Sequence, residues 1–411
     1  MLFIAKRIYR DGTQGRVSAS AVRIATAGIA VGILVMICSI CITIGFQNEI
    51  KNKVSSLVGD VQIINTRSLY NTNSFPIQIS DSIVSSISLL PGVEDIHRFV
   101  ICPGMLKTDE SFRGVFFRGV DSAFNKDFIS AHMLSGQVPS FGHTESSSDS
   151  ILISASLAST LQLQTGQRVY AYFFDKSLRA RRFVVAGIFQ THMADFDTKM
   201  CYADSRIVQK LAQWQPDQYS GAEIRLAKPE YADSVSSALF SMLSLKEDAY
   251  GQYYAFPRVN ELFPQVFSWL SLLDTNVVAI LIIMIAVACV TIISGLLIII
   301  LERTRFIGVM KSMGATNVQL RHVFLYLSAM IVLRGLAIGN VCAFFLLALQ
   351  HFCGIFSLDP AAYYLSKVPV AFPWTCLLLL NLITFIVCVL ALTIPTFIIS
   401  RIHPAKSIRF E

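Results

Sequence analysis

The sequence predicts a membrane protein of mixed α+β class, with four transmembrane helices and a large α/β and β-rich domain between the first two. Three observations predict this fold. Hydrophobic residues make up 54% of the 411 residues and charged residues only 15%, whereas soluble domains average about 25% charged residues. Four long apolar runs carry one charge at most. Between the first two runs lies a polar stretch long enough to bury a core of its own.

The first run, residues 24–46, carries no charge and, at about 1.5 Å per residue, crosses a hydrocarbon core about 30 Å thick. A cleaved signal peptide would have an apolar core of only about 7–15 residues, so we expect an uncleaved anchor helix. The other predicted transmembrane helices are residues 274–301, 323–349 and 374–400. The third contains Arg334. A charge at that depth is costly unless it faces the helix bundle or reaches the surface. A buried pairing role is favoured slightly over a functional one, and the sequence leaves both open.

The basic residues are unevenly distributed along the chain. Residues 47–276 contain 20 Lys or Arg and 23 Asp or Glu, a net charge of −3, and the remainder contains 14 against 4, a net charge of +10. The positive-inside rule therefore predicts that segments 1–23, 302–322 and 401–411 are cytoplasmic. Residues 47–273 and the loop 350–373 then lie on the other side. A mildly acidic external domain excludes a nucleic-acid partner, whereas membrane lipid surrounds the helices.

The two ends of the external domain share one pattern. Each end predicts a strand, a helix and a second strand, and together they suggest a split α/β module with a β-rich insertion at about residues 103–220. Cys102 and Cys201 lie in this domain, where an oxidising compartment would allow them to pair. The sequence leaves that pairing open. The predicted elements are 61–64, 81–90 and 93–101 at one end, and 222–226, 229–242 and 249–256 at the other.

No catalytic motif occurs in the sequence. There is no phosphate-binding loop, no H-E-x-x-H zinc motif and no G-x-S-x-G elbow. Asp195 and Asp197 fit a turn at least as well as a pair of catalytic carboxylates. We therefore expect no enzyme, no catalytic residue, no metal site and no cofactor bound by this chain.

Two features of the membrane part stand out. Gly28-x-x-x-Gly32 and Gly335-x-x-x-Gly339 are spacings that allow transmembrane helices to approach closely. The 302–317 loop places four apolar residues on one helical face and stops at Gly314. One interpretation is a charged turn that only fixes topology. The other is a short helix along the membrane that offers its apolar face, Phe306, Ile307, Met310 and Met313, to a cytoplasmic partner.

With this order of elements, the chain resembles the lipoprotein-releasing ABC permeases of the LolC/LolE family, within the wider FtsX/MacB-type group. The resemblance covers nearly the whole length. It includes Gly45-Phe-Gln-Asn-Glu-Ile at the exit of the first helix, Arg118-Gly-Val-Asp in the external domain, and the 302–317 turn. Tyr363-Tyr-Leu-Ser-Lys-Val-Pro-Val and the tail Pro404-Ala-Lys-Ser-Ile-Arg-Phe-Glu complete it.

The resemblance implies a permease of the bacterial inner membrane with a periplasmic domain. A separate cytoplasmic ABC ATPase would bind ATP and Mg and dock on the turn, and a second permease chain, identical or different, would enclose a cavity for the acyl chains of a lipoprotein. The ATPase-coupling residues would be Arg303, Arg305, Phe306, Ile307, Met310, Lys311, Met313 and Gly314. The acyl-chain cavity would contain Ile42, Ile44, Phe46, Phe263, Phe267, Leu270 and Val277.

The family also implies a soluble periplasmic lipoprotein carrier, which a long hairpin on one of the two permease types recruits. The corresponding hairpin here, residues 174–182, is short, so carrier capture by this chain is in doubt. Two alternatives remain open within the same fold. One is MacB-like export of a peptide, drug or lipid, and the other is FtsX-like regulation of a cell-wall enzyme without transport.

Overall fold

The structure is a computed structural model, and it describes residues 16–71, 73–122, 124, 126–142, 149–174 and 178–396. The chain forms two compact units. The helix unit contains the chain up to Asn48, Trp269–Ser357 and the chain from Lys367 onward, and the sheet unit contains Glu49–Ser268 and Leu358–Ser366. The basic termini, the tail motif from Pro404 and residues 175–177 of the hairpin lie outside the described residues.

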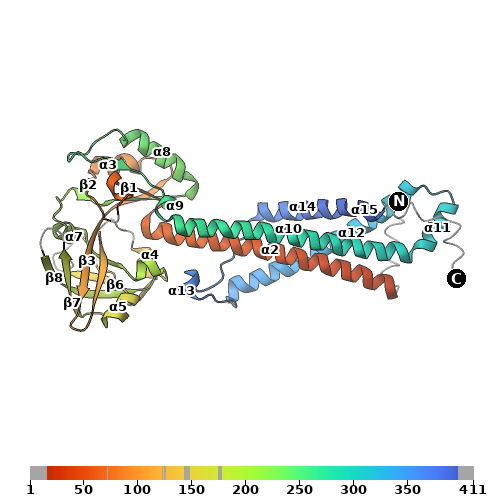
Figure 1. Cartoon of the computed structure of the whole chain (residues 1–411), viewed down its shortest axis with the longest axis horizontal. Coiled ribbons are helices and arrows are strands. Elements are labelled where there is room, and N and C mark those ends of the chain that lie inside the picture. Colours follow the sequence, from red (N-terminus) through yellow and green to blue (C-terminus); the bar gives the residue numbers. More distant parts are fainter. Residues whose placement is uncertain are drawn as a thin grey trace. The chain divides into compact units, whose positions relative to one another are not determined.

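Four helices of the described chain are long and apolar enough to cross a membrane. They are α2 (Arg16–Val58), α10 (Pro264–Glu302), α12 (Asn317–Cys353) and α14 (Trp374–Ala391), which is followed by α15 (Thr393–Thr396). In Figure 1 their membrane segments lie alongside one another. The first three contain the predicted runs and extend beyond them, because polar flanking residues continue a helix outside the hydrocarbon region. The fourth predicted run, 374–400, is not one helix, since α14 ends at Ala391 and α15 follows after Leu392; residues 397–400 lie outside the described residues.

Helix α2 packs closely against two neighbours through the predicted glycine pairs. A Cβ atom added at Gly28 would lie 2.6 Å from Thr291 Cγ2 of α10. On another side of α2, a Cβ atom at Gly335 of α12 would lie 2.8 Å from Ile29 Cβ. Since real Cβ contacts are longer, these helices approach as closely as they do only because both positions are glycine.

A polar pair links α12 to α14. Asn340 Nδ2 donates to Asn381 Oδ1 at 2.7 Å, and Asn381 Nδ2 donates back to Asn340 Oδ1 at 3.2 Å. In an apolar surrounding such a reciprocal amide pair satisfies groups that lipid cannot. Neither residue belongs to a motif that predicts this contact from the sequence.

The sheet unit contains two strand–helix–strand units whose strands interleave. The first is β1 (Val61–Asn65), α3 (Asp81–Ser88) and β3 (Val93–Lys107), and the second is β11 (Gly221–Leu226), α8 (Ala232–Leu243) and β12 (Tyr254–Ala255). Their order across the sheet is β12-β1-β11-β3. Ile63, Ile224 and Leu239 are buried in the core that these elements share.

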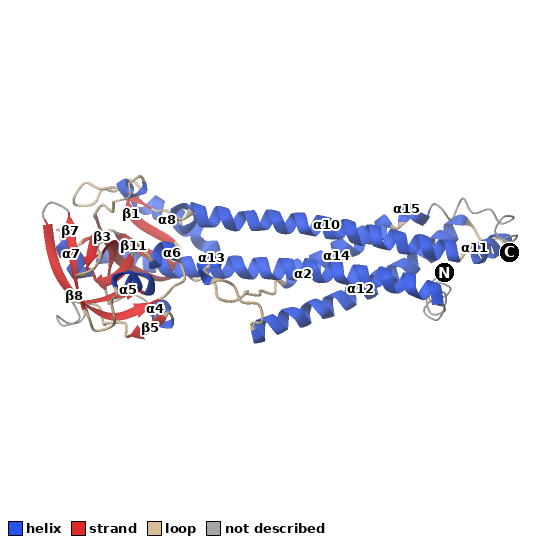
Figure 2. Cartoon of the chain, turned by 60° about the horizontal axis from the view of Figure 1, so that its bottom comes forward, coloured by secondary structure: helices blue, strands red, loops and turns tan. Residues whose placement is uncertain are grey.

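Between these two strand–helix–strand units, the chain of the sheet unit forms a closed barrel. Its strands follow the order β3-β4-β9-β6-β8, and β7 closes the ring because it pairs with both β8 and β3. Phe117, Phe173 and Phe183 fill the interior, with the Phe117 and Phe173 ring centroids 4.8 Å apart. The strands, drawn red in Figure 2, are β4 (Phe112–Val120), β6 (Ser150–Ser154), β7 (Arg168–Phe174), β8 (Leu178–Phe189) and β9 (Met200–Asp204).

Short elements complete this unit. The two-residue strands β2 (Ile77–Gln78) and β10 (Gln218–Tyr219) pair with each other, and β5 (Met133–Gly136) pairs with β8. The remaining helices are α4 (Asp127–Ala131), α5 (Ala155–Leu161), α6 (Ala194–Asp197), α7 (Ser205–Leu211), α9 (Val259–Leu262) and α13 (Pro360–Tyr363), with 3-10 turns at Thr66–Leu69 and Pro229–Tyr231.

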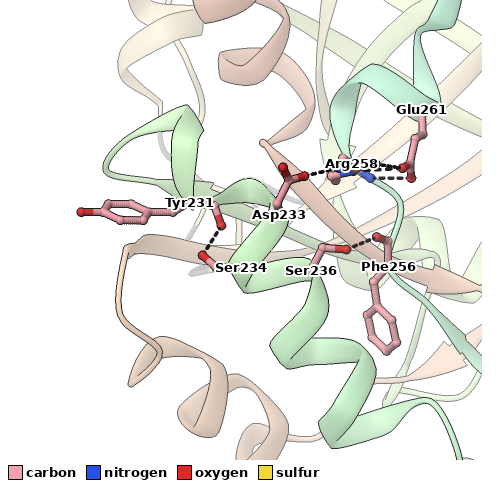
Figure 3. Close-up of polar contacts among 7 residues, drawn as sticks. All are labelled: Tyr231, Asp233, Ser234, Ser236, Phe256, Arg258 and Glu261. Carbon is pink, nitrogen blue, oxygen red and sulfur yellow. Dashed lines mark hydrogen bonds and ion pairs between the residues drawn. The ribbon is translucent and has the colours of Figure 1, made fainter.

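Arg258 anchors the segment that leads from β12 to α10. Figure 3 shows its guanidinium between Asp233 of α8 and Glu261 of α9, and its Nη2 lies 2.5 Å from Glu261 Oε1. Ser236 Oγ also donates to the carbonyl oxygen of Phe256 at 3.0 Å. These contacts hold the chain against α8 immediately before it enters α10.

Part of the predicted loop 350–373 belongs to the sheet unit. Residues Leu358–Ser366, which include α13, are grouped with that unit. The ammonium group of Lys53 donates to the carbonyl oxygen of Tyr364 at 2.7 Å. Burial of Lys53 lowers the pKa of its ammonium group, although Asp197 and Glu49 oppose that change.

The structure decides the open question of Cys102 and Cys201 and shows where Arg334 lies. Cys102 of β3 and Cys201 of β9 pair with Phe117 from opposite sides of β4, so about two strand spacings of 4.8 Å separate them. A disulfide requires Cα atoms within about 7 Å, and no disulfide joins the two residues. Arg334 is exposed on α12 within this single chain, so the chain alone does not bury it, and its pairing role stays a prediction.

Candidate coupling helix and acyl-chain site

The 302–317 loop forms a short helix bounded by defined ends. Helix α11 (Thr304–Ser312) follows α10 directly, and Gly314 has φ +91°, a left-handed conformation that favours glycine. Thr316 then caps α12. Its Oγ1 accepts from Gln319 N at 3.3 Å, while Gln319 Oε1 accepts from Thr316 N at 3.1 Å. This reciprocal arrangement is a capping box, which fixes where the next helix begins.

Most of the apolar face of α11 packs against the protein's own helix unit. Ile307 is fully buried, and Phe306 and Met310 pack against the same cluster. Within this chain, therefore, part of that face is already covered, and docking of a partner on the loop stays a prediction. Arg305, Val309 and Met313 are exposed; they recur every fourth position and so share one side of the helix. We call them the exposed edge of α11.

Three further coupling candidates lie around the ends of α11. Arg303 is half-buried at the N-cap position, and Lys311 is half-buried in the last turn. Gly314 is exposed and ends the helix. The loop thus brings the eight predicted coupling residues together, but only part of the set is accessible.

The seven predicted acyl-chain residues do not form one cluster. Five belong to the helix unit, where Phe46 and Leu270 are buried and Ile42, Ile44 and Val277 pack half-buried against the helix cluster. Phe263 and Phe267 belong to the sheet unit and are half-buried. The structure therefore divides the predicted cavity into a helix-unit set and a sheet-unit set.

In the helix-unit set, polar and aromatic contacts join α2 to α10. The Phe46 ring meets Trp269 edge to face, with centroids 5.6 Å apart. Gln47 Nε2 donates to the carbonyl oxygen of Leu270 at 3.0 Å and to Asp274 Oδ1 at 2.8 Å. Neither Trp269 nor Gln47 was among the site residues predicted from the sequence. A tryptophan at the end of an apolar run is typical of a membrane interface, and this pattern would have identified Trp269.

The Gly45 motif at the exit of the first helix has a packing role. A Cβ atom at Gly45 would lie 2.8 Å from both Ala371 N and Pro369 O, and Ala371 N donates to the carbonyl oxygen of Cys41 at 3.1 Å. The chain that leads into α14 therefore passes directly over α2 at this point, where only glycine leaves enough space.

Arg118, which begins the second motif, is the centre of a buried ionic network. It forms an ion pair with Glu223, to which His97 Nε2 and Gln62 Nε2 also bond at 3.0 Å. Burial alone would raise the pKa of Glu223, but the Arg118 guanidinium and the His97 hydrogen bond outweigh it and lower that pKa. Glu223 therefore stays ionised inside the domain.

Asp197 and Arg181 of the hairpin have structural partners. Asp197 accepts hydrogen bonds from the backbone N–H groups of Thr191 and His192 and from the Thr191 hydroxyl. It is the last residue of the short helix α6, and its carboxylate holds the preceding loop against that helix. Arg181 forms an ion pair with Asp149 at 2.7 Å. The hairpin is short, since Phe174 and Leu178 already pair across it.

Comparisons with known proteins agree with this architecture. The family described as MacB-like periplasmic core domain matches residues 24–240, and the FtsX-like permease C-terminal family matches residues 276–404. The chain is 20% identical to the lipoprotein-releasing system transmembrane protein LolE of Haemophilus influenzae, with 98% of both chains covered. It is also 20% identical to the corresponding LolC of Xylella fastidiosa, covering 93% of this chain and 92% of that relative.

A solved structure of the periplasmic region of MacB from Actinobacillus actinomycetemcomitans covers 50% of this chain and 91% of its own length. Its identity is 13% and its TM-score 0.35, a value too low to carry a structural argument.

A MacB-like periplasmic core domain joined to an FtsX-like permease region defines a class of ABC transporter permeases. It also defines an inner-membrane protein with a periplasmic domain. Within that class, the chain belongs to the LolC/LolE-type permeases.

Proposed function

We propose that this chain is the permease subunit of an ABC transporter that extracts acylated lipoproteins from the inner membrane, driven by a separate ATPase. The observation that carries the proposal is the likeness to LolE and LolC over 93–98% of this chain. Both relatives are named as parts of a lipoprotein-releasing system. For that reason, export of another substrate and regulation without transport are not favoured.

In this proposal both termini and the 302–322 loop are cytoplasmic, and residues 47–273 and the 350–373 loop are periplasmic. The net charge of +10 outside residues 47–276 supports this orientation. We keep the four predicted transmembrane segments, residues 24–46, 274–301, 323–349 and 374–400, as the boundaries between these parts.

The ATPase would dock on the exposed edge of α11. Val309 and Met313 offer apolar contact there and Arg305 offers a cation. Ile307, with Phe306 and Met310, holds the other side of α11 on the helix cluster. A push on the exposed edge would then be transmitted into α10 and α12, which α11 joins. ATP and Mg would be bound by the ATPase, with no cofactor in this chain.

The acyl chains would enter beside the periplasmic ends of α2 and α10, in a cavity completed by a second permease chain, identical or different. Ile42, Ile44 and Val277 are half-buried and would meet an acyl chain first. Phe46 and Leu270 are buried and would become accessible when α2 and α10 separate. Because the hairpin is short, recruitment of the periplasmic carrier would fall to the second permease where that chain is a different one.

The test is depletion of this protein in its own cells, followed by separation of the inner and outer membranes. One acylated outer-membrane lipoprotein is then followed by immunoblotting. Accumulation of this lipoprotein in the inner membrane is expected, and re-expression of the wild-type chain, but not of the Phe46→Asp variant, should reverse it. Unchanged sorting after full depletion would contradict the proposal.

A further inference from the structure

We infer that the periplasmic domain contains its own binding pocket for a single acyl chain that ends in a carbonyl group. A pocket of about 290 Å³ lies wholly within the sheet unit. Its apolar walls include Val58, Ile101, Phe116, Phe196, Leu262 and Phe263. This inference deepens the proposed function, on which it rests for the origin of the ligand.

The walls come from the outer surface of the barrel and from the segments that continue α2 and α10. Val58 is the last residue of α2, and Phe263 directly precedes α10. The Phe263 ring lies 5.7 Å from Phe196. Phe116 alternates along β4 with Val115 and Phe117, which face the barrel interior, so its own side chain faces outward.

Three polar residues line the pocket, namely Gln62, Arg118 and Lys199. The Gln62 amide nitrogen already donates to Val58 O and Glu223 Oε1, so the two cations supply the donors open to a ligand. Arg118 lines the pocket although only 1% of its surface is exposed, and among the described residues its Nε has no hydrogen-bond partner. A buried donor without an acceptor costs about 1–3 kcal/mol. Lys199 adds an exposed cation to the lining. A ligand that brings an oxygen acceptor would satisfy these groups.

Size and chemistry select the ligand. Pockets for whole drug-sized ligands span about 300–1,000 Å³, so this one suits one chain and not a complete lipid. A peptide would bring several backbone N–H groups, each of which needs an acceptor, and Gln62 is the one lining residue with a neutral side-chain acceptor. A fatty acyl chain brings only a carbonyl acceptor at one end. A free fatty acid and an acyl chain carried by a lipoprotein share this chemistry.

The experiment uses the full-length protein in nanodiscs of phosphatidylethanolamine and phosphatidylglycerol. Two photoactivatable probes carry a diazirine near the methyl end of a hexadecanoyl chain. One is the free acid and the other a diacylglyceryl-cysteine peptide. Crosslinks located by mass spectrometry are expected in residues 196–200 or 259–263. Labelling by the peptide alone points to lipoprotein, and labelling by the acid alone or by both points to a general acyl site; each of these results supports the pocket.

Phe116→Trp, which fills the pocket, should lower this labelling about tenfold. The matched control is Phe112→Trp, four residues earlier on β4 and exposed, which should leave the labelling unchanged. If Phe116→Trp is poorly folded, Ile101→Phe replaces it. Absence of crosslinks in both segments, or labelling that neither pocket variant reduces, overturns the inference. Pocket labelling together with unchanged lipoprotein sorting in depleted cells would instead overturn the proposed function alone.

Discussion

The contact between α2 and α12 at Gly339 makes a sharp prediction about stability. A methyl group at Gly339 would lie 2.1 Å from Ile33 Cγ2 and 2.6 Å from the carbonyl oxygen of Ala30. The isoleucine methyl can rotate away, but the backbone oxygen cannot, so the two helices must separate. Overpacking of this kind costs about 1–3 kcal/mol, which exceeds the gain of up to about 1 kcal/mol from replacing glycine by alanine within a helix.

The control is Gly32→Ala, the same substitution in the other glycine pair. There the added methyl would meet Ala288 Cβ at 3.9 Å, an ordinary contact, so only the helix-propensity gain remains. Thermal unfolding of both variants in one detergent should therefore give a lower melting temperature for Gly339→Ala and an unchanged or higher one for Gly32→Ala. Equal melting temperatures would refute the close approach of α2 and α12.

Three further predictions address the other sites. Met313→Asp should strongly reduce co-purification of the ATPase while leaving the chain inserted, because it places a charge in the docking contact; unchanged co-purification would exclude the exposed edge of α11. Glu223→Gln should destabilise the protein by about 3–5 kcal/mol at neutral pH, since it leaves the buried Arg118 charge without a counter-charge. The folded-state pKa of Glu223 is lowered, so the stability that its ionised carboxylate contributes is lost as pH falls through that pKa. The melting temperatures of wild type and variant should therefore converge in acid, and a difference that stays constant with pH would contradict this role of Glu223. A double-mutant cycle of Asn340→Leu and Asn381→Leu should give a coupling of about 0.6 kcal/mol, and at most about 1.7 kcal/mol, and strict additivity would contradict the pair.

The helices were the most predictable part of the fold. Residues 24–46 and 274–301 are long enough and apolar enough to span a bilayer, and this property does not depend on their neighbours. The strands at 61–64 and 222–226 were predictable for a similar reason, since alternation and flanking breakers are local properties. These elements are present as β1 and β11.

The surfaces that face one another were less predictable, because they depend on contacts distant in sequence. The spacing of Phe306, Ile307 and Met310 gives an apolar face, but spacing does not tell whether a partner or the protein's own helices cover it. Arg334 is exposed in this chain, a result that depends on how α12 is rotated. Pairing of β7 with β3, for example Lys107 with Tyr170, closes the barrel. The two strands are far apart in sequence, so no local sequence pattern predicts that they pair.

That closure has a consequence for recognition. Six strands exchange their backbone hydrogen bonds around the ring, so among the described residues this ring offers no open edge to which a strand from another protein can add. In the described part of the chain, the sheet ends at the two-residue β12 and the four-residue β5. Any periplasmic protein that contacts the barrel must therefore read its side chains, such as the exposed Phe112, Tyr170 and Phe174, and its specificity can change by substitution without rebuilding the sheet.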